Sequence, residues 1–141
     1  MTFSGLFSLE EAQRCAAELD VLRPTFVTPR SAILDLRDII PPEPPALEII
    51  RQIVCKGRAS GLQRISVIIK SPVVKSQALQ LAFLADSADA VRCINASKLE
   101  NWEKLSLDWA VSGIEPEYDA SFDTGHINLG KLTVPSKVSV K

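Results

Sequence analysis

The sequence predicts an α/β domain in which four strands alternate with four helices around a mostly parallel or mixed sheet. Two observations indicate this class. Short apolar runs rich in β-branched residues alternate with longer segments whose apolar residues recur at helical spacing. The connections between strands are also long enough to hold a crossover helix, which parallel neighbours require. We therefore expect the order β-α-β-α-β-α-β-α, with crossover helices between the strands.

The first strand, the first helix and the second strand are predicted from the opening residues. Residues 2–5 form a short extended segment, and Ser8 with Glu11 makes the pattern of a capping box. The helix predicted over residues 9–20 places its apolar side chains on one face: Leu9, Ala12, Cys15, Ala16 and Leu19. After a connection that contains two prolines, the apolar residues 33–36 predict the second strand.

A proline-rich loop separates the second strand from the second helix. No helix or central strand tolerates the prolines of residues 41–45, although Pro45 suits the first turn of a helix. Apolar residues then recur at helical spacing until Gly61, which is a typical stop: Leu47, Ile50, Ile53 and Val54. Residues 65–69 are almost continuously apolar, as in a strand that is covered on both faces.

The last three elements follow from similar signals. Ser71 and Pro72 supply an N-cap and a first-turn proline for the third helix, and residues 90–94 predict the fourth strand. Ser97 with Glu100 repeats the capping box and predicts the start of the last helix. Four large apolar side chains lie on one side of this helix and predict a core or interface stripe: Leu99, Trp102, Leu105 and Trp109.

The chain of 141 residues is expected to form one domain over residues 1–111, followed by an extension over residues 112–141. The charges of the extension are acidic in its first half and basic in its second half. Apolar residues alternate near its end: Leu132, Val134, Val138 and Val140. We expect this segment either to add an edge strand, in its own chain or in a second copy as a homodimer, or to form a flexible tail.

Composition argues against several classes of protein. Sixteen basic and seventeen acidic residues leave no strongly basic face for nucleic acid. No apolar run reaches the roughly 18 residues of a membrane span, and the N-terminus lacks the pattern of a signal peptide, so we expect a cytoplasmic protein. Cys15, Cys55 and Cys93 are far apart and form no C-x-x-C pair, which favours reduced thiols over a metal site.

The sequence predicts neither an enzyme nor a cofactor. The single histidine, His126, lies in the extension, and no nucleophile motif or glycine-rich phosphate loop is present. Asp35 leaves two interpretations open. In the first, Asp35 is a phosphoacceptor with Lys70 as its partner, as in a receiver domain. In the second, which we favour, Asp35 is a strand-end carboxylate that caps a loop or pairs with Arg37.

Several motifs occur in an order that is known from one superfamily. The pattern consists of the opening Gly5-x-Phe7-Ser8-x-Glu10-Glu11 and its helix, residues 33–37, residues 64–70, the Ser-Pro helix and a final helix with tryptophan. Over residues 1–111 this order resembles the STAS superfamily, specifically its bacterial SpoIIAA-like branch, whose fold is likened to the lipid-binding Sec14 domain. Members of this superfamily have an additional strand before the opening glycine, so we expect the first edge position here to be short or vacant.

The resemblance implies a regulatory, non-catalytic module that docks a protein partner. Phosphorylatable members carry an Asp-Ser/Thr-x-Gly-like step where this chain has residues 41–45, which offer no hydroxyl, so the implied phosphorylation switch is absent. The partner-docking region of the superfamily corresponds here to Arg37, Asp38, Glu43, Glu48, Arg51 and Lys56. The Sec14 likeness implies an alternative, a carrier of a small apolar ligand or lipid, which needs a cavity of roughly 300 Å³ or more.

Overall fold

The computed structural model describes residues 1–28 and 30–116, and its strands form one four-stranded parallel sheet. The strands follow the order of the chain, β1-β2-β3-β4, and all neighbouring pairs are parallel. Their bounds are β1 (Thr2–Leu6), β2 (Arg30–Ile40), β3 (Leu62–Ile69) and β4 (Val91–Asn95). The predicted α/β class and element order are confirmed, and of the two predicted sheet types the parallel one is present.

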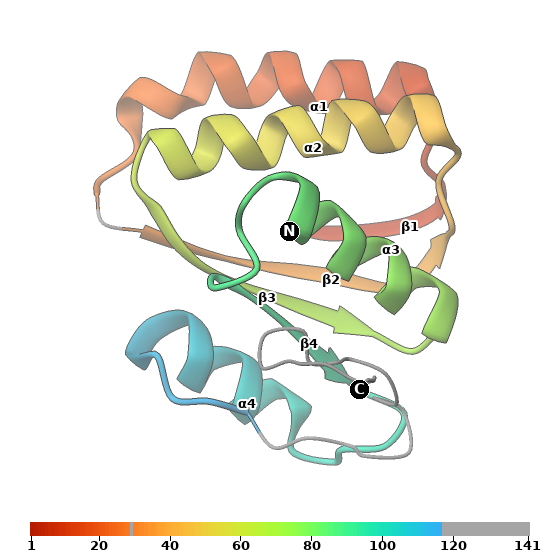
Figure 1. Ribbon diagram of the computed structural model, residues 1–141, viewed down its shortest axis with the longest axis vertical. Coiled ribbons are helices and arrows are strands. Elements are labelled where there is room, and N and C mark those ends of the chain that lie inside the picture. The colour runs from red at the N-terminus through yellow and green to blue at the C-terminus, as the bar shows by residue number, and fades with distance from the viewer. Residues whose placement is uncertain (29, 117–141) are drawn as a thin grey trace, which may run out of the picture.

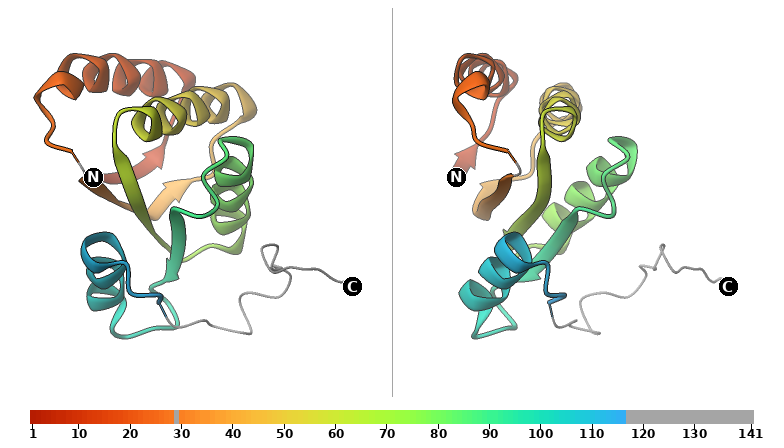
Figure 2. Two further views of the ribbon diagram at one scale, coloured as in Figure 1. Left: turned by 60° about the vertical axis from the view of Figure 1, so that its left-hand side comes forward. Right: turned by 90° about the vertical axis from the view of Figure 1, so that its left-hand side faces the viewer.

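Helices cover the two faces of the sheet unequally (Figures 1 and 2). The α-helices are α1 (Leu9–Leu22), α2 (Pro44–Ala59), α3 (Pro72–Leu84) and α4 (Trp102–Leu107), and shorter turns are the 3₁₀ turn η1 (Arg23–Thr25) and the π-helical η2 (Asp108–Ser112). Sequential parallel strands joined by crossovers of one hand place their helices on one face, and α1, α2 and α3 lie side by side there. The segment α4–η2 lies on the opposite face.

The first edge position is occupied by β1, a strand of five residues that pairs with β2. It is short, as expected, but it is not vacant. Among the described residues β1 has no second neighbour in the sheet. The residues that were expected to pair along such an edge, Leu132, Val134, Val138 and Val140, lie outside the described part of the chain.

A bulge in β2 sets the direction of its side chains. Thr2 pairs with Asp35 and Ser4 pairs with Asp38, so β2 has one residue more than β1 between these two pairs. Leu36 and Ile39 both pack in the core that lies between the sheet and the layer of α1, α2 and α3. Because alternation is interrupted between them, the consecutive residues 37 and 38 both belong to the opposite face of the sheet.

The predicted helix starts are confirmed for α1 and α3. The Ser8 Oγ accepts a hydrogen bond from the Glu11 N–H at 3.2 Å, and the Ser71 Oγ accepts from the N–H groups of Val73 and Val74. After α2, Gly61 has a φ of +104°, and a Cβ atom there would collide with the Thr28 side chain. Only glycine fits this tight return into β3.

The predicted start of the last helix is wrong. The Ser97 N–H and Oγ both donate to the Asn95 Oδ1, at 3.0 and 2.7 Å, so residues 95–97 form a turn in place of a capping box. The helix begins only at Trp102 and continues as η2. The turn that the Asn95 side chain holds ends before α4, whose N-cap residue is Asn101 and not Ser97.

The core on the side of α1, α2 and α3 has two parts of unequal packing. The first joins β3, β4 and α3 through fully buried residues: Ile65, Val67, Ile69, Val74, Ala82 and Val91. The second, near β1, α1 and α2, has only Phe7, Ala12 and Ala46 as its fully buried members. The larger apolar residues that α2 turns toward the sheet, such as Ile50 and Val54, are only half-buried. The helix layer is thus packed closely over β3 and loosely over β2.

The segment α4–η2 packs on β3 and β4. The Ser66 Oγ donates to the Ser106 carbonyl at 2.7 Å, and the buried Trp109 donates its ring N–H to the Ala90 carbonyl at 3.1 Å. Trp109 therefore belongs to the core, which is one of the two roles predicted for the apolar stripe of this helix. The same face of the sheet is open at the end of β1 and β2, where Leu6 and Ile40 are 64% and 52% exposed.

Candidate functional site

The predicted docking residues lie on two opposite sides of the sheet. Glu48, Arg51 and Lys56 are on α2, in the helix layer. The Arg51 guanidinium donates two hydrogen bonds to the Glu48 carboxylate, at 2.9 and 2.6 Å, and these bonds hold the pKa of Glu48 below its usual value. The Lys56 Nζ lies 3.5 Å from an Asp20 carboxylate oxygen on α1. The structure brings these three residues together as a surface of paired charges.

The other predicted docking residues are elsewhere. Arg37 and Asp38 lie on β2, on the face that also carries α4. The Arg37 guanidinium carbon lies 4.4 Å from the centre of the Trp102 ring, which is a cation–π contact. Glu43 precedes α2 as its N-cap residue, and its side chain makes no capping hydrogen bond. The structure therefore does not join the α2 residues and the β2 residues into one surface.

Asp35 is held by Arg37. The Arg37 Nε–H and the Arg37 backbone N–H donate to the Asp35 Oδ1 at 2.9 and 3.2 Å, and the Arg37 Nη2–H donates to the Oδ2 at 2.8 Å. These bonds lower the pKa of Asp35 and raise the pKa of Arg37. The predicted strand-end position of Asp35 is wrong, because β2 runs from Arg30 to Ile40 and Asp35 lies in its middle, whereas the predicted pairing with Arg37 is confirmed.

An apolar strip with an acidic border lies on the open part of this face. Leu6 and Ile40 are partners in the register of β1 and β2, and both side chains are exposed. Besides Asp35, the carboxylates of Asp38 and Glu103 are close enough to raise the pKa of Arg37. Three carboxylates thus lie around one guanidinium, and one of them, Asp38, is two residues before the exposed Ile40 on β2. We call Leu6, Ile40, Asp38 and Glu103 the strip.

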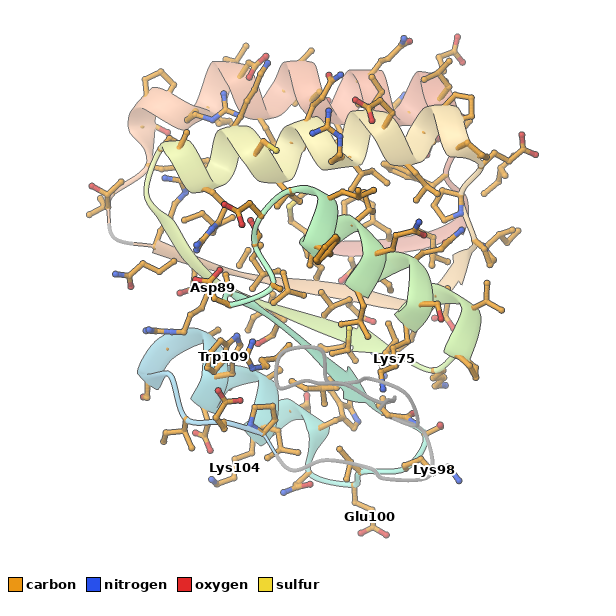
Figure 3. The ribbon with its side chains drawn as sticks, in the orientation of Figure 1. Lys75, Asp89, Lys98, Glu100, Lys104 and Trp109 are labelled. Atoms are coloured by element: carbon orange, nitrogen blue, oxygen red, sulfur yellow. The ribbon has the colours of Figure 1, made fainter. Side chains whose placement is uncertain are left out.

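A polar groove of about 970 Å³ lies at the opposite end of the sheet, where β3 and β4 begin. Asp89 and Trp109 both line it, and Figure 3 shows their side chains at this end. Arg58 donates to the carbonyls of Leu62 and Gln63 at 3.1 and 2.9 Å and pairs with Asp89. Because this guanidinium already satisfies backbone carbonyls and a carboxylate, it stabilises the framework of the groove.

An apolar cavity of about 140 Å³ lies between the sheet and the helix layer. It spans the region between the closely packed core at β3 and the smaller core at α1. Its walls come from β1, β2, β3, β4, α1, α2 and α3, and nearly all of them are carbon: among the lining residues are Phe3, Cys15, Leu36, Ile50, Ile53, Val54, Val67 and Ala78. Such a cavity excludes charged groups but accepts an apolar molecule.

One polar side chain lines this cavity. The Gln77 Nε2–H donates to the Pro42 carbonyl at 3.1 Å. The Gln77 Oε1 is buried, and it has no hydrogen-bond partner among the residues that the structure describes. Gln77 was not among the predicted site residues. The sequence does contain a signal for it, because this polar residue falls three residues after Val74 and four before Leu81, at a core-facing position of α3.

Comparison of the chain with protein-family models, with curated proteins and with solved structures gave no match. In residues 1–28 and 30–116, no helix is long and apolar enough to cross a membrane. The same residues contain no cluster of three or more His, Cys, Asp or Glu side chains that is suited to a metal ion.

Proposed function

We propose that this chain is a non-catalytic, STAS-like interaction module that docks a protein partner on the strip formed by Leu6, Ile40, Asp38 and Glu103. The observation that supports this proposal is the exposure of Leu6 and Ile40 as direct neighbours on a sheet face. An aliphatic pair on a rigid sheet can anchor a partner without loss of backbone freedom. The proposed role needs no phosphorylation switch, in keeping with the absence of hydroxyls from residues 41–45.

The border of the strip defines the chemistry of the partner. Arg37 is held by Asp35 and Trp102, whereas Asp38 and Glu103 add two negative charges beside the aliphatic pair. A complementary segment carries aliphatic side chains flanked by lysine or arginine, because opposite charges at the rim favour encounter and correct orientation. The proposed partner is therefore a protein with a basic and aliphatic segment.

The two surfaces of the predicted docking region allow a matched test. Ile40→Lys places a positive charge in the middle of the strip, and Arg51→Glu reverses a charge on α2. Both positions are at least partly exposed, so both variants are expected to fold. Affinity capture from the native host with the wild-type chain and both variants is the measurement.

We expect one captured protein to be lost with Ile40→Lys and retained with Arg51→Glu. That protein should also show crosslinks to β1 or β2 by mass spectrometry. If the captured protein is lost only with Arg51→Glu, the docking surface lies on α2 and not on the strip. Equal capture by all three chains would contradict the proposal.

A second candidate function is supported by the cavity. Its volume of about 140 Å³ is less than half of the roughly 300 Å³ that a lipid carrier needs, so a lipid does not fit it in this state. A smaller apolar ligand does fit. Native mass spectrometry of the purified chain tests this candidate: a bound small molecule that is released on denaturation supports it, and failure to bind any small apolar probe contradicts it.

A further inference from the structure

We infer that the cavity binds a neutral, ring-sized molecule with one hydrogen-bond donor, which donates to the Gln77 Oε1. This inference rests on the second candidate function, that the cavity binds a small apolar ligand, and adds the chemical class of that ligand. It is carried by two observations together: an apolar cavity of about 140 Å³ and a buried amide oxygen without a partner at its wall.

The orientation of the Gln77 amide is set by its neighbour. A backbone carbonyl only accepts hydrogen bonds, and the Pro42 carbonyl lies 3.1 Å from the amide nitrogen. Rotating the amide by half a turn would bring two acceptors together and break this bond. The atom that remains without a partner is therefore the oxygen, on a side chain that lines the cavity; it has almost no accessible surface, so a ligand reaches it through a small shift of the Gln77 side chain.

Water is a poor partner for this oxygen. A buried water molecule typically makes about three hydrogen bonds, and the other side chains around the cavity are almost entirely aliphatic or aromatic. A water molecule next to Gln77 would leave most of its hydrogen bonds unmade. A ligand that carries one donor on an apolar body satisfies the oxygen and fills the remaining space with carbon.

The volume limits the size of the ligand. An apolar cavity of about 150 Å³ lined by leucine, isoleucine and phenylalanine is known to take up benzene. The cavity described here is nearly as large and is lined by the same kinds of side chains. It therefore suits a single aromatic ring or a compact aliphatic molecule of about seven or eight non-hydrogen atoms.

The apolar lining also limits the charge that the ligand can carry. A carboxylate would bring only acceptors to the Gln77 oxygen and would lose its hydration in an apolar space. An ammonium group carries donors but suffers the same loss of hydration without a carboxylate to offset it among the lining residues. The lining thiol of Cys15 has a pKa raised by burial, so it is neutral as well. A phenol, a small alcohol or a similar neutral donor remains.

Phenol and toluene form a matched pair of probes, because the hydroxyl of phenol replaces a methyl group of similar size. We would titrate the full chain with each probe and follow its backbone amide signals by nuclear magnetic resonance. The same titrations are repeated with Gln77→Leu, which removes the acceptor and keeps the side-chain volume similar. The quantity compared is the ratio of the two dissociation constants, toluene over phenol.

We expect this ratio to fall about fivefold or more from wild type to Gln77→Leu, because a hydrogen bond to a buried acceptor is lost only with phenol. Binding of both probes with an unchanged ratio would overturn the role of Gln77 and leave the cavity as a binding site. Failure of both probes to bind the wild-type chain would overturn the inference and the second candidate function together.

Ala78→Leu supplies a second control, because it fills the cavity from α3 and keeps the Gln77 amide in the chain. We expect this variant to fold and to bind neither probe. If it binds phenol as well as the wild-type chain does, phenol occupies another place and the inference is wrong. If Gln77→Leu does not fold, the loss of phenol and toluene binding in Ala78→Leu still decides whether the cavity is the site.

Discussion

The two ends of the sheet are built from the same kind of βαβ unit but are packed differently. At β3, the side chains of Ile65, Val67 and Ile69 are buried against α3, and Ile69 has no exposed surface. At β1 and β2, the helices α1 and α2 bury mainly small residues, and their larger ones line a cavity that β3 and α3 also line. We call these the β3 half and the β1 half of the domain.

The difference shows how a parallel sheet can combine stability with a binding space. Burial of branched side chains in the β3 half supplies most of the apolar contribution to the free energy of folding. The domain can then keep a cavity between the two halves, because the stability that the empty volume costs is provided by the closely packed part of the β3 half. The two candidate binding places, the cavity and the strip, both involve β1 and β2.

The largest expected effect is a contrast between two isoleucines. Ile69→Ala should lower the free energy of unfolding by about 4 kcal/mol, because it opens a new void in a closely packed core. Ile50→Ala, beside the existing cavity, should cost only about 1 to 2 kcal/mol, since its side chain is half-buried. Urea denaturation measures both. Equal losses would remove the distinction between the halves.

A second contrast adds volume instead of removing it. Ala78→Leu fills the cavity and should raise the free energy of unfolding by about 1 kcal/mol. Ala90→Leu, in the β3 half, adds the same volume where only 1% of the residue is exposed, and should lower that free energy by about 2 kcal/mol. Thermal denaturation gives the sign of each change. Destabilisation by Ala78→Leu would mean that the cavity cannot accept carbon.

A smaller effect concerns the pair beside the strip. Asp35→Asn should lower the free energy of unfolding near neutral pH by about 1 kcal/mol, because Arg37 loses charge-assisted hydrogen bonds in a partly exposed place. The pKa of Asp35 is lowered by folding, so its contribution is present above the ordinary value of 3.8 and is lost as pH falls through the folded-state pKa.

The difference between wild type and Asp35→Asn should therefore disappear at low pH. Urea denaturation of both chains at several pH values is the measurement. Arg37→Gln is the matched control, because it removes the two guanidinium hydrogen bonds from the other side and keeps the one from the backbone N–H. A difference that persists below the folded-state pKa would show that the carboxylate charge does not stabilise the fold.

The smallest effect is a difference in thiol reactivity. Burial raises the pKa of Cys93, on β4, to about 12, so its reactive thiolate is scarce at pH 8. The pKa of Cys15 is also raised by burial, but Cys15 is only partly buried and lines the cavity. Alkylation followed by peptide mass spectrometry should modify Cys15 before Cys93, and phenol should slow the reaction at Cys15. The reverse order would contradict the loose packing of the β1 half.

Much of the fold follows from local signals in the sequence. Ser8 and Ser71 mark helix starts because their hydroxyls accept from backbone N–H groups that lack other partners. Gly61 marks the return into β3 because its φ is positive. The signal at Ser97 failed because the Asn95 side chain, two residues earlier, accepts from the Ser97 N–H and hydroxyl and holds residues 95–97 in a turn. Competition between two short polar side chains is decided by strand geometry, which the sequence pattern does not contain.

The candidate sites were less predictable, and the reason is geometric. Arg37 and Arg51 were assigned to one surface because the resemblance to the STAS superfamily places its partner-docking region on both. Regular alternation after Leu36 places Arg37 on the face of α4, so Arg37 and Arg51 lie on opposite sides of the sheet. The cavity had no sequence signal beyond the polar Gln77 in an apolar stripe, because an empty volume depends on the spacing between layers.

Hydrogen exchange of the backbone amides in the free protein tests the unequal packing of the two halves most directly. We expect amides of β3 to exchange only through global unfolding, whereas amides of α1 and α2 exchange through a local opening of clearly lower free energy. Binding of phenol should raise the free energy of that local opening. Equal opening free energies in α2 and β3, unaffected by phenol, would contradict the account.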